Sequence, residues 1–176
     1  MSSPLDERLA KLAERDRRLA AGEILFRARD PVRSLFLVAS GAMRLVRVLP
    51  NGLELTLQHA RPGAILAEAS LFAERYHCDA VAIEDAVVRI VPLRRLTAAL
   101  ARDAALAHAW AHHLALEVQR ARAHAELLSL KRVADRVEAW VALHGPVPAK
   151  GRWRQMASEI GVTPEALYRE LARRRG

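Results

Sequence analysis

The chain has 176 residues, of which 52% are hydrophobic, and a formal net charge of +8. This length allows one large domain or a medium domain with a small one, and the apolar content provides a core and argues against disorder. A single cysteine excludes a disulfide framework and any four-cysteine metal or iron–sulfur site within one chain.

The sequence carries no signal for export or for a membrane. Its first 21 residues are charged throughout and lack the apolar stretch of a signal peptide, and no apolar run reaches 18 residues. We therefore expect a cytoplasmic protein with no membrane partner.

The first half is predicted to begin with a helix and to continue as short strands. Residues 5–20 carry leucines at helical spacing: Leu5, Leu9, Leu12 and Leu19. Strand-like runs follow at 23–27, 34–39, 42–48, 54–59, 79–83 and 87–91. Glycine and proline separate these runs, and Asn51-Gly52 is a strong hairpin signal. Many short strands with regular turns predict a small antiparallel barrel or jelly roll.

Helical periodicity returns at Leu93, and one stretch follows a heptad pattern from Ala104. Its later members, at alternating steps of four and three, are Ala107, Ala111, Leu114, Val118, Ala121, Ala125 and Leu128. This spacing is typical of a coiled-coil seam, and small alanines favour close approach of two helices. We therefore predict a parallel homodimer through these residues. The alternative is a helix that packs on the β-domain of its own chain.

The last 25 residues have the pattern of a helix-turn-helix, preceded by an amphipathic helix that begins near Val133. Two short apolar stripes contain Met156, Ala157, Ile160, Leu167 and Leu171. Between the stripes, Gly161 suits a tight turn, Thr163 suits an N-cap and Pro164 suits the first helical position. Two helices joined in this way can place the second one in the major groove of DNA, although an ordinary helical corner has the same pattern.

Charge favours the DNA-binding interpretation. Between residues 150 and 176 there are seven Lys or Arg and three Glu, so this segment carries +4, half of the net charge. Clustered cations suit the neutralisation of phosphates, although the last arginines could also form a solvated tail. The predicted DNA contacts are Arg154, Thr163, Glu165, Ala166, Arg169 and Arg173.

The order of barrel, long helix, helix and helix-turn-helix resembles the Crp–Fnr family of bacterial transcription factors, the cyclic-AMP receptor and fumarate-nitrate regulators. The glycines Gly22, Gly41, Gly52 and Gly63 match the family's β-roll. The stretch Ala67-Glu68-Ala69-Ser70-Leu71-Phe72 matches its phosphate-binding cassette, whose pattern Gly-Glu-x-x-Leu-Phe has glycine at the position of Ala67. The resemblance implies an α+β fold with a jelly-roll-like antiparallel β-roll sensor over 1–103, a dimerisation helix over 104–130 and a small helix-turn-helix domain over 131–176. It also implies double-stranded DNA and RNA polymerase as partners.

The resemblance further predicts base reading by the second helix of the motif. The family's Arg-Glu-x-x-x-Arg spacing is kept at Glu165 and Arg169, and its first Arg is replaced by Pro164. Glu accepts a hydrogen bond from cytosine N4, and Arg donates to guanine O6 and N7. The alternative is a surface salt bridge between these two residues, which stand four positions apart.

The resemblance also predicts an effector pocket formed by Glu68, Ser70, His77, Cys78, Asp79 and Arg122. In this pocket the family's phosphate-binding Arg falls on Cys78, and the Ser after it falls on Asp79. A thiol lacks the charge-assisted donors that a buried phosphate needs, and a carboxylate repels an anion. The adenine-contacting Thr-Ser pair of the cyclic-AMP-binding members falls on Ala121-Arg122. We therefore expect an unknown effector that is not a cyclic nucleotide.

Other chemistry is weakly represented. Cys78 could be a redox centre or a ligand of a metal or haem, in a sensor that acts mainly through protein contacts, or it could be a small buried hydrophobe. His108 and His112 stand four apart without a third ligand, so no metal site is predicted. A cupin-like enzyme would need more than His59 and His77 among the strands. No catalytic motif is recognisable, and we expect no enzyme.

Overall fold

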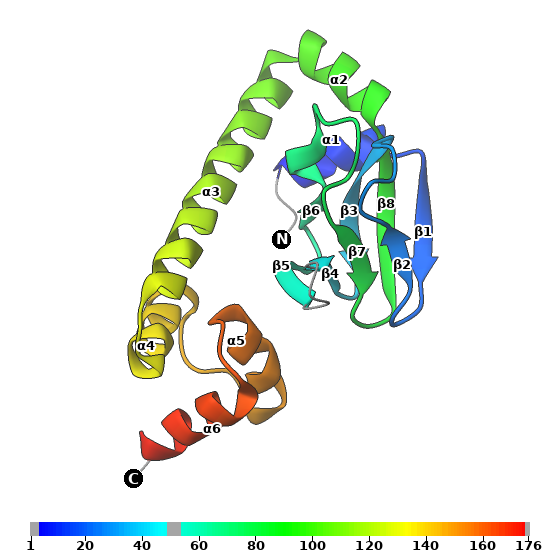
Figure 1. Cartoon of the computed structure of the whole chain (residues 1–176). Helices are drawn as coiled ribbons and strands as arrows, with labels where there is room; N and C mark the ends of the chain where they lie inside the picture. The colour runs from blue at the N-terminus through cyan, green and yellow to red at the C-terminus, as the bar shows by residue number, and fades with distance from the viewer. Residues whose placement is uncertain (1–3, 49–53, 175–176) are drawn as a thin grey trace. The chain divides into compact units, whose positions relative to one another are not determined.

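The computed structural model describes residues 4–48 and 54–174 and separates into two compact units, Met1–Leu114 and Ala115–Gly176. The division lies within one long helix, α3 (Ala104–Ser129). The first unit also contains α1 (Pro4–Leu12), the strands and α2 (Leu93–Arg102), and the second contains α4 (Val133–His144), α5 (Trp153–Glu159) and α6 (Pro164–Arg173) (Figure 1). The predicted division at residues 103 and 130 stays a prediction.

The first unit is a β-roll of two antiparallel four-stranded sheets, in the orders β1-β8-β3-β6 and β2-β7-β4-β5. The strands are β1 (Arg15–Leu19), β2 (Ile24–Phe26), β3 (Ser34–Ser40), β4 (Met43–Val48), β5 (Glu54–Ala60), β6 (Ile65–Leu66), β7 (Asp79–Ala82) and β8 (Ala86–Pro92). This confirms the predicted α+β fold with an antiparallel β-roll. The predicted turn at Asn51-Gly52 lies outside the described residues.

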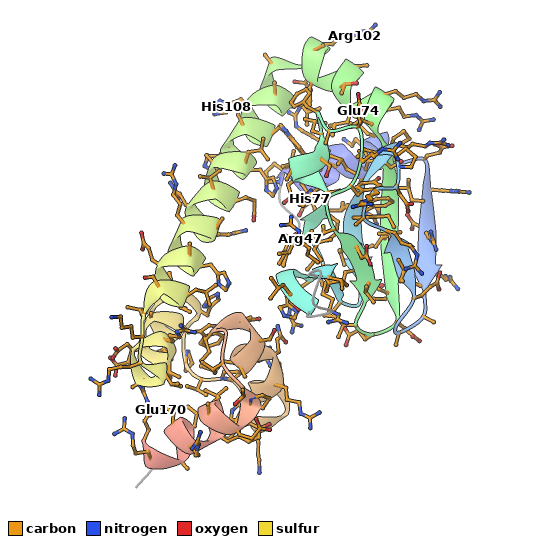
Figure 2. All side chains as sticks on the ribbon, in the orientation of Figure 1. Arg47, Glu74, His77, Arg102, His108 and Glu170 are labelled. Carbon is orange, nitrogen blue, oxygen red and sulfur yellow. The ribbon has the colours of Figure 1, made fainter. Side chains whose placement is uncertain are left out.

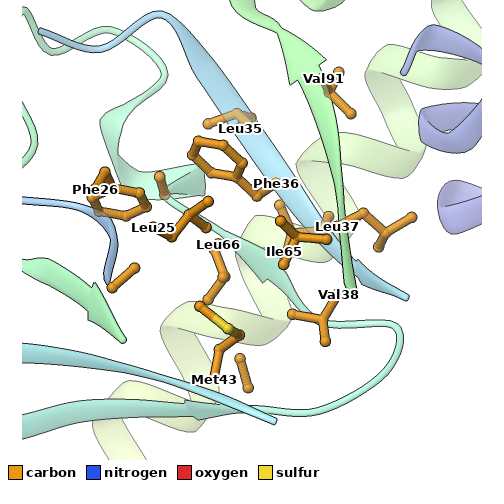
Figure 3. Close-up of a cluster of buried hydrophobic side chains, with 14 of the residues drawn as sticks. Leu25, Phe26, Leu35, Phe36, Leu37, Val38, Met43, Ile65, Leu66 and Val91 are labelled. Carbon is orange, nitrogen blue, oxygen red and sulfur yellow. The ribbon is translucent and has the colours of Figure 1, made fainter. Parts of the chain in front are cut away.

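An aromatic group forms part of the β-roll core. The ring centroids of Phe26 and Tyr76 lie 4.0 Å apart, and those of Phe26 and Phe36 lie 5.4 Å apart. The Tyr76 hydroxyl donates to the carbonyl oxygen of Ser34 at 2.7 Å, so this buried polar group is satisfied. Figure 3 shows Phe26 and Phe36 beside Leu66 and other aliphatic side chains in one cluster. Dense packing of this kind leaves little room for changes in side-chain volume.

The helix predicted over residues 5–20 is wrong beyond Leu12. Residues Arg15–Leu19 form β1, which pairs antiparallel with β8 from Arg15 opposite Ile90 to Leu19 opposite Ala86. Leu19 is buried in the β-roll core, whereas the charged residues before it lie largely outside that core. Pairing with a distant strand has therefore overridden the local leucine spacing. The charges on this edge strand also discourage pairing with another chain.

The turn between β3 and β4 requires glycine for two reasons. Gly41 has φ of +75°, a conformation that side chains rarely adopt. A Cβ atom placed there would also overlap the carbonyl oxygen of Asp85 and the Cα of Ala86. Gly41 thus allows the start of β8 to lie directly against this turn.

The second unit has its own core between the end of α3 and the helices α4, α5 and α6. Its buried members are Leu127, Val137, Trp140, Trp153, Met156, Ala157, Ile160, Leu167 and Leu171. Both predicted apolar stripes of the helix-turn-helix are therefore confirmed. The Trp140 indole N–H donates to Oε2 of Glu159 at 2.8 Å, which links α4 to the end of α5.

The turn signals of the motif are also confirmed. Gly161 has φ of +64°, and the Thr163 hydroxyl accepts from the backbone N–H of Ala166 at 3.2 Å. Pro164 is the first residue of α6. Within the described ranges, no helix is both long and apolar enough to cross a membrane.

Candidate DNA interface and sensor pocket

The exposed face of α6 carries most of the predicted DNA contacts. Leu167 and Leu171 fix the orientation of α6 because both side chains are buried in the core of the second unit. Thr163, Glu165 and Arg169 are exposed, and Ala166 is half-buried. This arrangement presents a carboxylate and a guanidinium four residues apart on the solvent side of the helix.

Glu165 and Arg169 do not pair with each other. Among the described residues, neither side chain makes a hydrogen bond or an ion pair. The surface salt bridge that was the alternative to base reading is therefore not formed. Both groups keep their hydrogen-bonding capacity for another molecule.

Arg173 differs from Arg169 because it is paired. It donates to Glu170 from Nη2 at 2.8 Å and from Nε at 3.1 Å. Arg174 also donates to Glu170, at 2.8 Å, and reaches Oε1 of Glu138 on α4 at 3.2 Å. Hydrogen bonds from Arg173 and Arg174 lower the pKa of Glu170 to about 2. This ionised carboxylate, labelled on α6 in Figure 2, offsets part of the positive charge at the end of the helix.

Arg154 lies exposed on α5, beside the exposed Lys150 and Arg152 that precede that helix. In the second unit the structure therefore retains the cationic segment predicted for contact with phosphates. Arg175 lies outside the described residues.

The predicted dimer seam follows α3 through both units. In the second unit Val118 is 48% exposed and Leu128 is 38% exposed, and Ala121 and Ala125 are exposed as well. In the first unit Ala111 is exposed and Ala107 is half-buried. Most of the seam is thus available to a second copy of the chain.

The alternative role of α3, packing on its own β-roll, is realised at the start of the helix. Leu106 and Trp110 are buried members of the β-roll core, and Leu114 packs against it. Leu106 and Trp110 lie one turn apart on α3, on the helix face next to the seam. Leu114 belongs to both patterns, because it fits the seam spacing and contacts the core.

The cassette is recognisable by its backbone. Ala67 has φ of +68° at the position where the Crp–Fnr pattern has glycine, and the short 3-10 helix η1 (Glu68–Ser70) follows it. Ser70 is only 1% exposed, and its Oγ lies 3.5 Å from Nδ1 of His77. Leu71 is buried, whereas Phe72 is 91% exposed. The turn therefore brings Ser70 and His77 together.

Cys78 and Asp79 have separate structural roles. Cys78 is 2% exposed in the β-roll core, and burial raises the pKa of its thiol to about 11. Asp79 accepts a hydrogen bond on Oδ1 from the backbone N–H of Ala28 at 2.6 Å, so its carboxylate anchors the chain after β2. Arg122, the last predicted pocket residue, is exposed on α3 in the second unit.

Arg47 is a cation near the cassette that the sequence analysis did not single out. Leu45 pairs with Ala80 and Val46 with Asp79, so continuation of this register places Arg47 opposite Cys78. Burial lowers the pKa of His77, and the charge of Arg47 lowers it further. Figure 2 shows Arg47 and His77 close together on one edge of the β-roll. A basic residue in a strand is too common to have been a useful signal.

No cluster of three His, Cys, Asp or Glu side chains suited to a metal occurs among residues 4–48 and 54–174. His108 and His112 are both exposed on α3. Within the part of the chain that the structure describes, no third ligand joins this pair.

A β-roll with this cassette, followed by a long helix and a helix-turn-helix, defines a class of transcription regulators. Residues 16–103 match the cyclic nucleotide-binding domain family. The chain is 32% identical over 157 residues to the cyclic AMP receptor protein of Thermus thermophilus, covering 85% of this chain and 72% of the relative. It is 28% identical over 156 residues to the transcriptional regulator LdrP of Thermus thermophilus, covering 89% and 74%.

Solved structures agree with this assignment. The catabolite activator protein of Thermus thermophilus superposes with a TM-score of 0.61 at 28% identity, over 97% of this chain and 82% of that one. FixK2 of Bradyrhizobium japonicum shares the fold with a TM-score of 0.75 at 23% identity, over 90% and 83%. So does the c-di-GMP responsive regulator CLP of Xanthomonas campestris, with a TM-score of 0.73 at 20% identity, over 97% and 90%. The chain belongs to the Crp–Fnr family of transcription regulators.

Proposed function

We propose that the chain binds a specific sequence of duplex DNA as a parallel homodimer and thereby regulates transcription in the cytoplasm, in contact with RNA polymerase. The observation that carries this proposal is the exposed face of α6. Glu165 and Arg169 stand there without a partner among the described residues, opposite the buried Leu167 and Leu171. Two such helices related by a two-fold axis would enter successive major grooves, about 34 Å apart.

Selection from a randomised duplex pool, followed by binding titrations at several salt concentrations, tests this proposal. Arg169→Ala should relax discrimination at one base pair and cost about 1–3 kcal/mol at that position. Arg154→Ala is the matched control, because loss of a phosphate contact weakens all sequences alike and reduces the salt dependence. Equal losses of specific and non-specific binding in Arg169→Ala would refute the base-reading role.

We further propose that the effector is not a cyclic nucleotide. Cys78 replaces the family's phosphate-binding Arg with a buried, protonated thiol, and a thiol is a poor partner for a phosphate. The carboxylate of Glu68 could accept a hydrogen bond from a ribose hydroxyl, but it cannot attract an anion. Arg47 lies on this edge of the β-roll and is the residue to test as a replacement for the missing phosphate-binding arginine.

Calorimetry and thermal melting with cyclic AMP, cyclic GMP and cyclic di-GMP test the exclusion. We include cyclic di-GMP because the structural neighbour CLP responds to it. A ligand present at 100 times its dissociation constant stabilises the folded state by about 2.7 kcal/mol, which is readily measured. We expect no heat and no shift. Saturable stabilisation that Arg47→Ala abolishes would overturn the exclusion and would show that Arg47 replaces the missing arginine.

The second candidate, a redox sensor acting through protein contacts, has less support. The nucleophilic form of cysteine is the thiolate, and a buried thiol whose pKa is about 11 is protonated at neutral pH. The position of Cys78 in the core favours the role of a small buried hydrophobe.

A further inference from the structure

Arg136, on α4, binds three different segments of the second unit. Its Nε donates to the carbonyl oxygen of Leu130 at 2.7 Å, and its Nη2 donates to that of Leu128 at 3.0 Å. Its Nη1 lies 3.0 Å from the carbonyl oxygens of both Ile160 and Gly161. One guanidinium thus joins the end of α3, the link to α4 and the turn of the helix-turn-helix.

These carbonyl groups lie at or just beyond the ends of α3 and α5, where the helix itself supplies no donor. The last carbonyls of an α-helix have no partner within the helix, and Leu128 lies at the end of α3. Ile160 and Gly161 follow α5 in the same way. Only three residues, Leu130 to Arg132, separate α3 from α4, and such a link would by itself allow α4 to rotate relative to α3. The hydrogen bonds of Arg136 restrain this rotation.

The turn of the motif also lies directly against α3. A Cβ atom on Gly161 would lie 2.9 Å from Cδ2 of Leu128 and 3.3 Å from Nη1 of Arg136. Glycine is therefore required there both by its φ of +64° and by the close approach. Leu128 is at the same time the last residue of the predicted dimer seam.

We propose that Arg136 is a positioning residue that sets the half-site spacing of the DNA operator. It fixes the helix-turn-helix to the part of α3 that carries the dimer seam, so the two recognition helices of a dimer keep a constant separation. The inference rests on the proposed function, since spacing has meaning only for a DNA-binding dimer. Arg136 itself need not touch DNA.

The separation matters because DNA is helical. With about 10.5 base pairs per turn, adding one base pair rotates one half-site by about 34° relative to the other. A rigid dimer must then distort the DNA or lose contacts, whereas a dimer with a free pivot can follow the rotation. The dependence of affinity on spacer length therefore tests the junction, meaning the contacts of Arg136 with the end of α3 and with the turn at Gly161. The dependence of affinity on the bases within a half-site tests α6.

The experiment uses the full chain and an operator selected with the wild-type protein, with variants that lengthen or shorten the spacer by one base pair. Arg136→Met keeps the aliphatic stem and removes the donors, and Arg136→Lys keeps the charge but cannot reach three segments from one ammonium. Arg132→Met is the matched control, because it removes the same charge nearby from an exposed side chain that makes no hydrogen bond among the described residues.

The wild type and Arg132→Met should lose at least about tenfold in affinity on either altered spacer. Arg136→Met and Arg136→Lys should bind all three spacers within about threefold of one another and should remain dimers. Base discrimination within a half-site should stay as in the wild type. If the Arg136 variants do not fold, Gly161→Ala is the second test, because it disturbs the same junction from its other side. It should reduce the dependence of affinity on spacer length, which we call the spacing profile.

Three results would overturn the inference: a wild-type profile that does not depend on spacing, an Arg136→Met profile as steep as that of the wild type with only a lower melting temperature, or full retention of the profile by Arg136→Lys. Failure of the wild type to select any duplex would instead refute the proposed function. The two failures are therefore distinguishable.

Discussion

Val118→Glu is expected to convert the proposed homodimer into monomers, whereas Leu116→Glu is not. The two residues lie two positions apart on α3 and therefore point about 200° apart around the helix. Both are large, exposed apolar side chains, at 48% and 37%, and neither belongs to a core cluster. Leu114 fits the seam equally well, but it packs against the β-roll core, so its replacement would disturb folding as well.

The expected magnitude follows from the exposure of Val118 and from the two-fold symmetry. Each copy would lose the burial of about half a valine side chain, or about 1 kcal/mol, and there are two copies. Near the two-fold axis each residue meets its own copy, and two carboxylates about 4 Å apart repel by about 4 kcal/mol at an effective dielectric constant of 20. A total loss of about 6 kcal/mol weakens dimerisation by about four orders of magnitude.

Light scattering and sedimentation over a wide range of protein concentrations measure this change. Glu has a higher helix propensity than Val, so α3 itself should not be weakened, and circular dichroism checks that both variants are folded. An unchanged dissociation constant in Val118→Glu would refute the seam. Equal dissociation of both variants would show that the apolar seam is not the determinant.

Three further outcomes are expected. Cys78 should react with alkylating reagents only on unfolding, and Cys78→Ala should keep DNA binding, because the thiol is buried and its pKa is raised to about 11. Glu170→Gln should remove an acid-sensitive contribution to the free energy of unfolding. Because the pKa of Glu170 is lowered, this contribution is complete above about pH 4.5 and is lost as the pH falls towards about 2. Urea unfolding at several pH values measures it. Gly41→Ala should destabilise by about 3 kcal/mol through backbone strain and overlap with Asp85, while Gly22→Ala, at a positive φ but with no atom within 4 Å of the new Cβ, should cost about 1 kcal/mol.

Local signals made the helix-turn-helix predictable. The turn at Gly161, the cap at Thr163 and the proline at 164 all act within a few residues, and the structure uses each as the sequence predicted. Strand β1 could not be found in this way. Its sequence, Arg-Asp-Arg-Arg-Leu, has little strand propensity, and it is a strand because β8 offers a free edge more than 65 residues away.

For the cassette, the family resemblance predicted the position of the turn but not its contacts with other strands. The order of residues located the turn, and Ala67 adopts the left-handed conformation for which the family pattern uses glycine. The sequence could not show that the carboxylate of Asp79 is held by the N–H of Ala28, or that the register places Arg47 opposite Cys78. Both facts depend on which strands are neighbours, and a single sequence does not state this.

The long helix explains why one periodicity supported two interpretations. A seam with a strict seven-residue repeat drifts by about 20° per heptad around a straight α-helix, so a neighbouring face comes close to the seam along its length. At the start of α3, large residues such as Leu106 and Trp110 pack on the β-roll. Further along, Ala121 and Ala125 lie exposed, and small side chains allow close approach of a second helix. Packing on the β-roll and the proposed pairing with a second copy therefore use different residues except at Leu114, which fits the seam and also contacts the core. A substitution at Leu114 would test both at once.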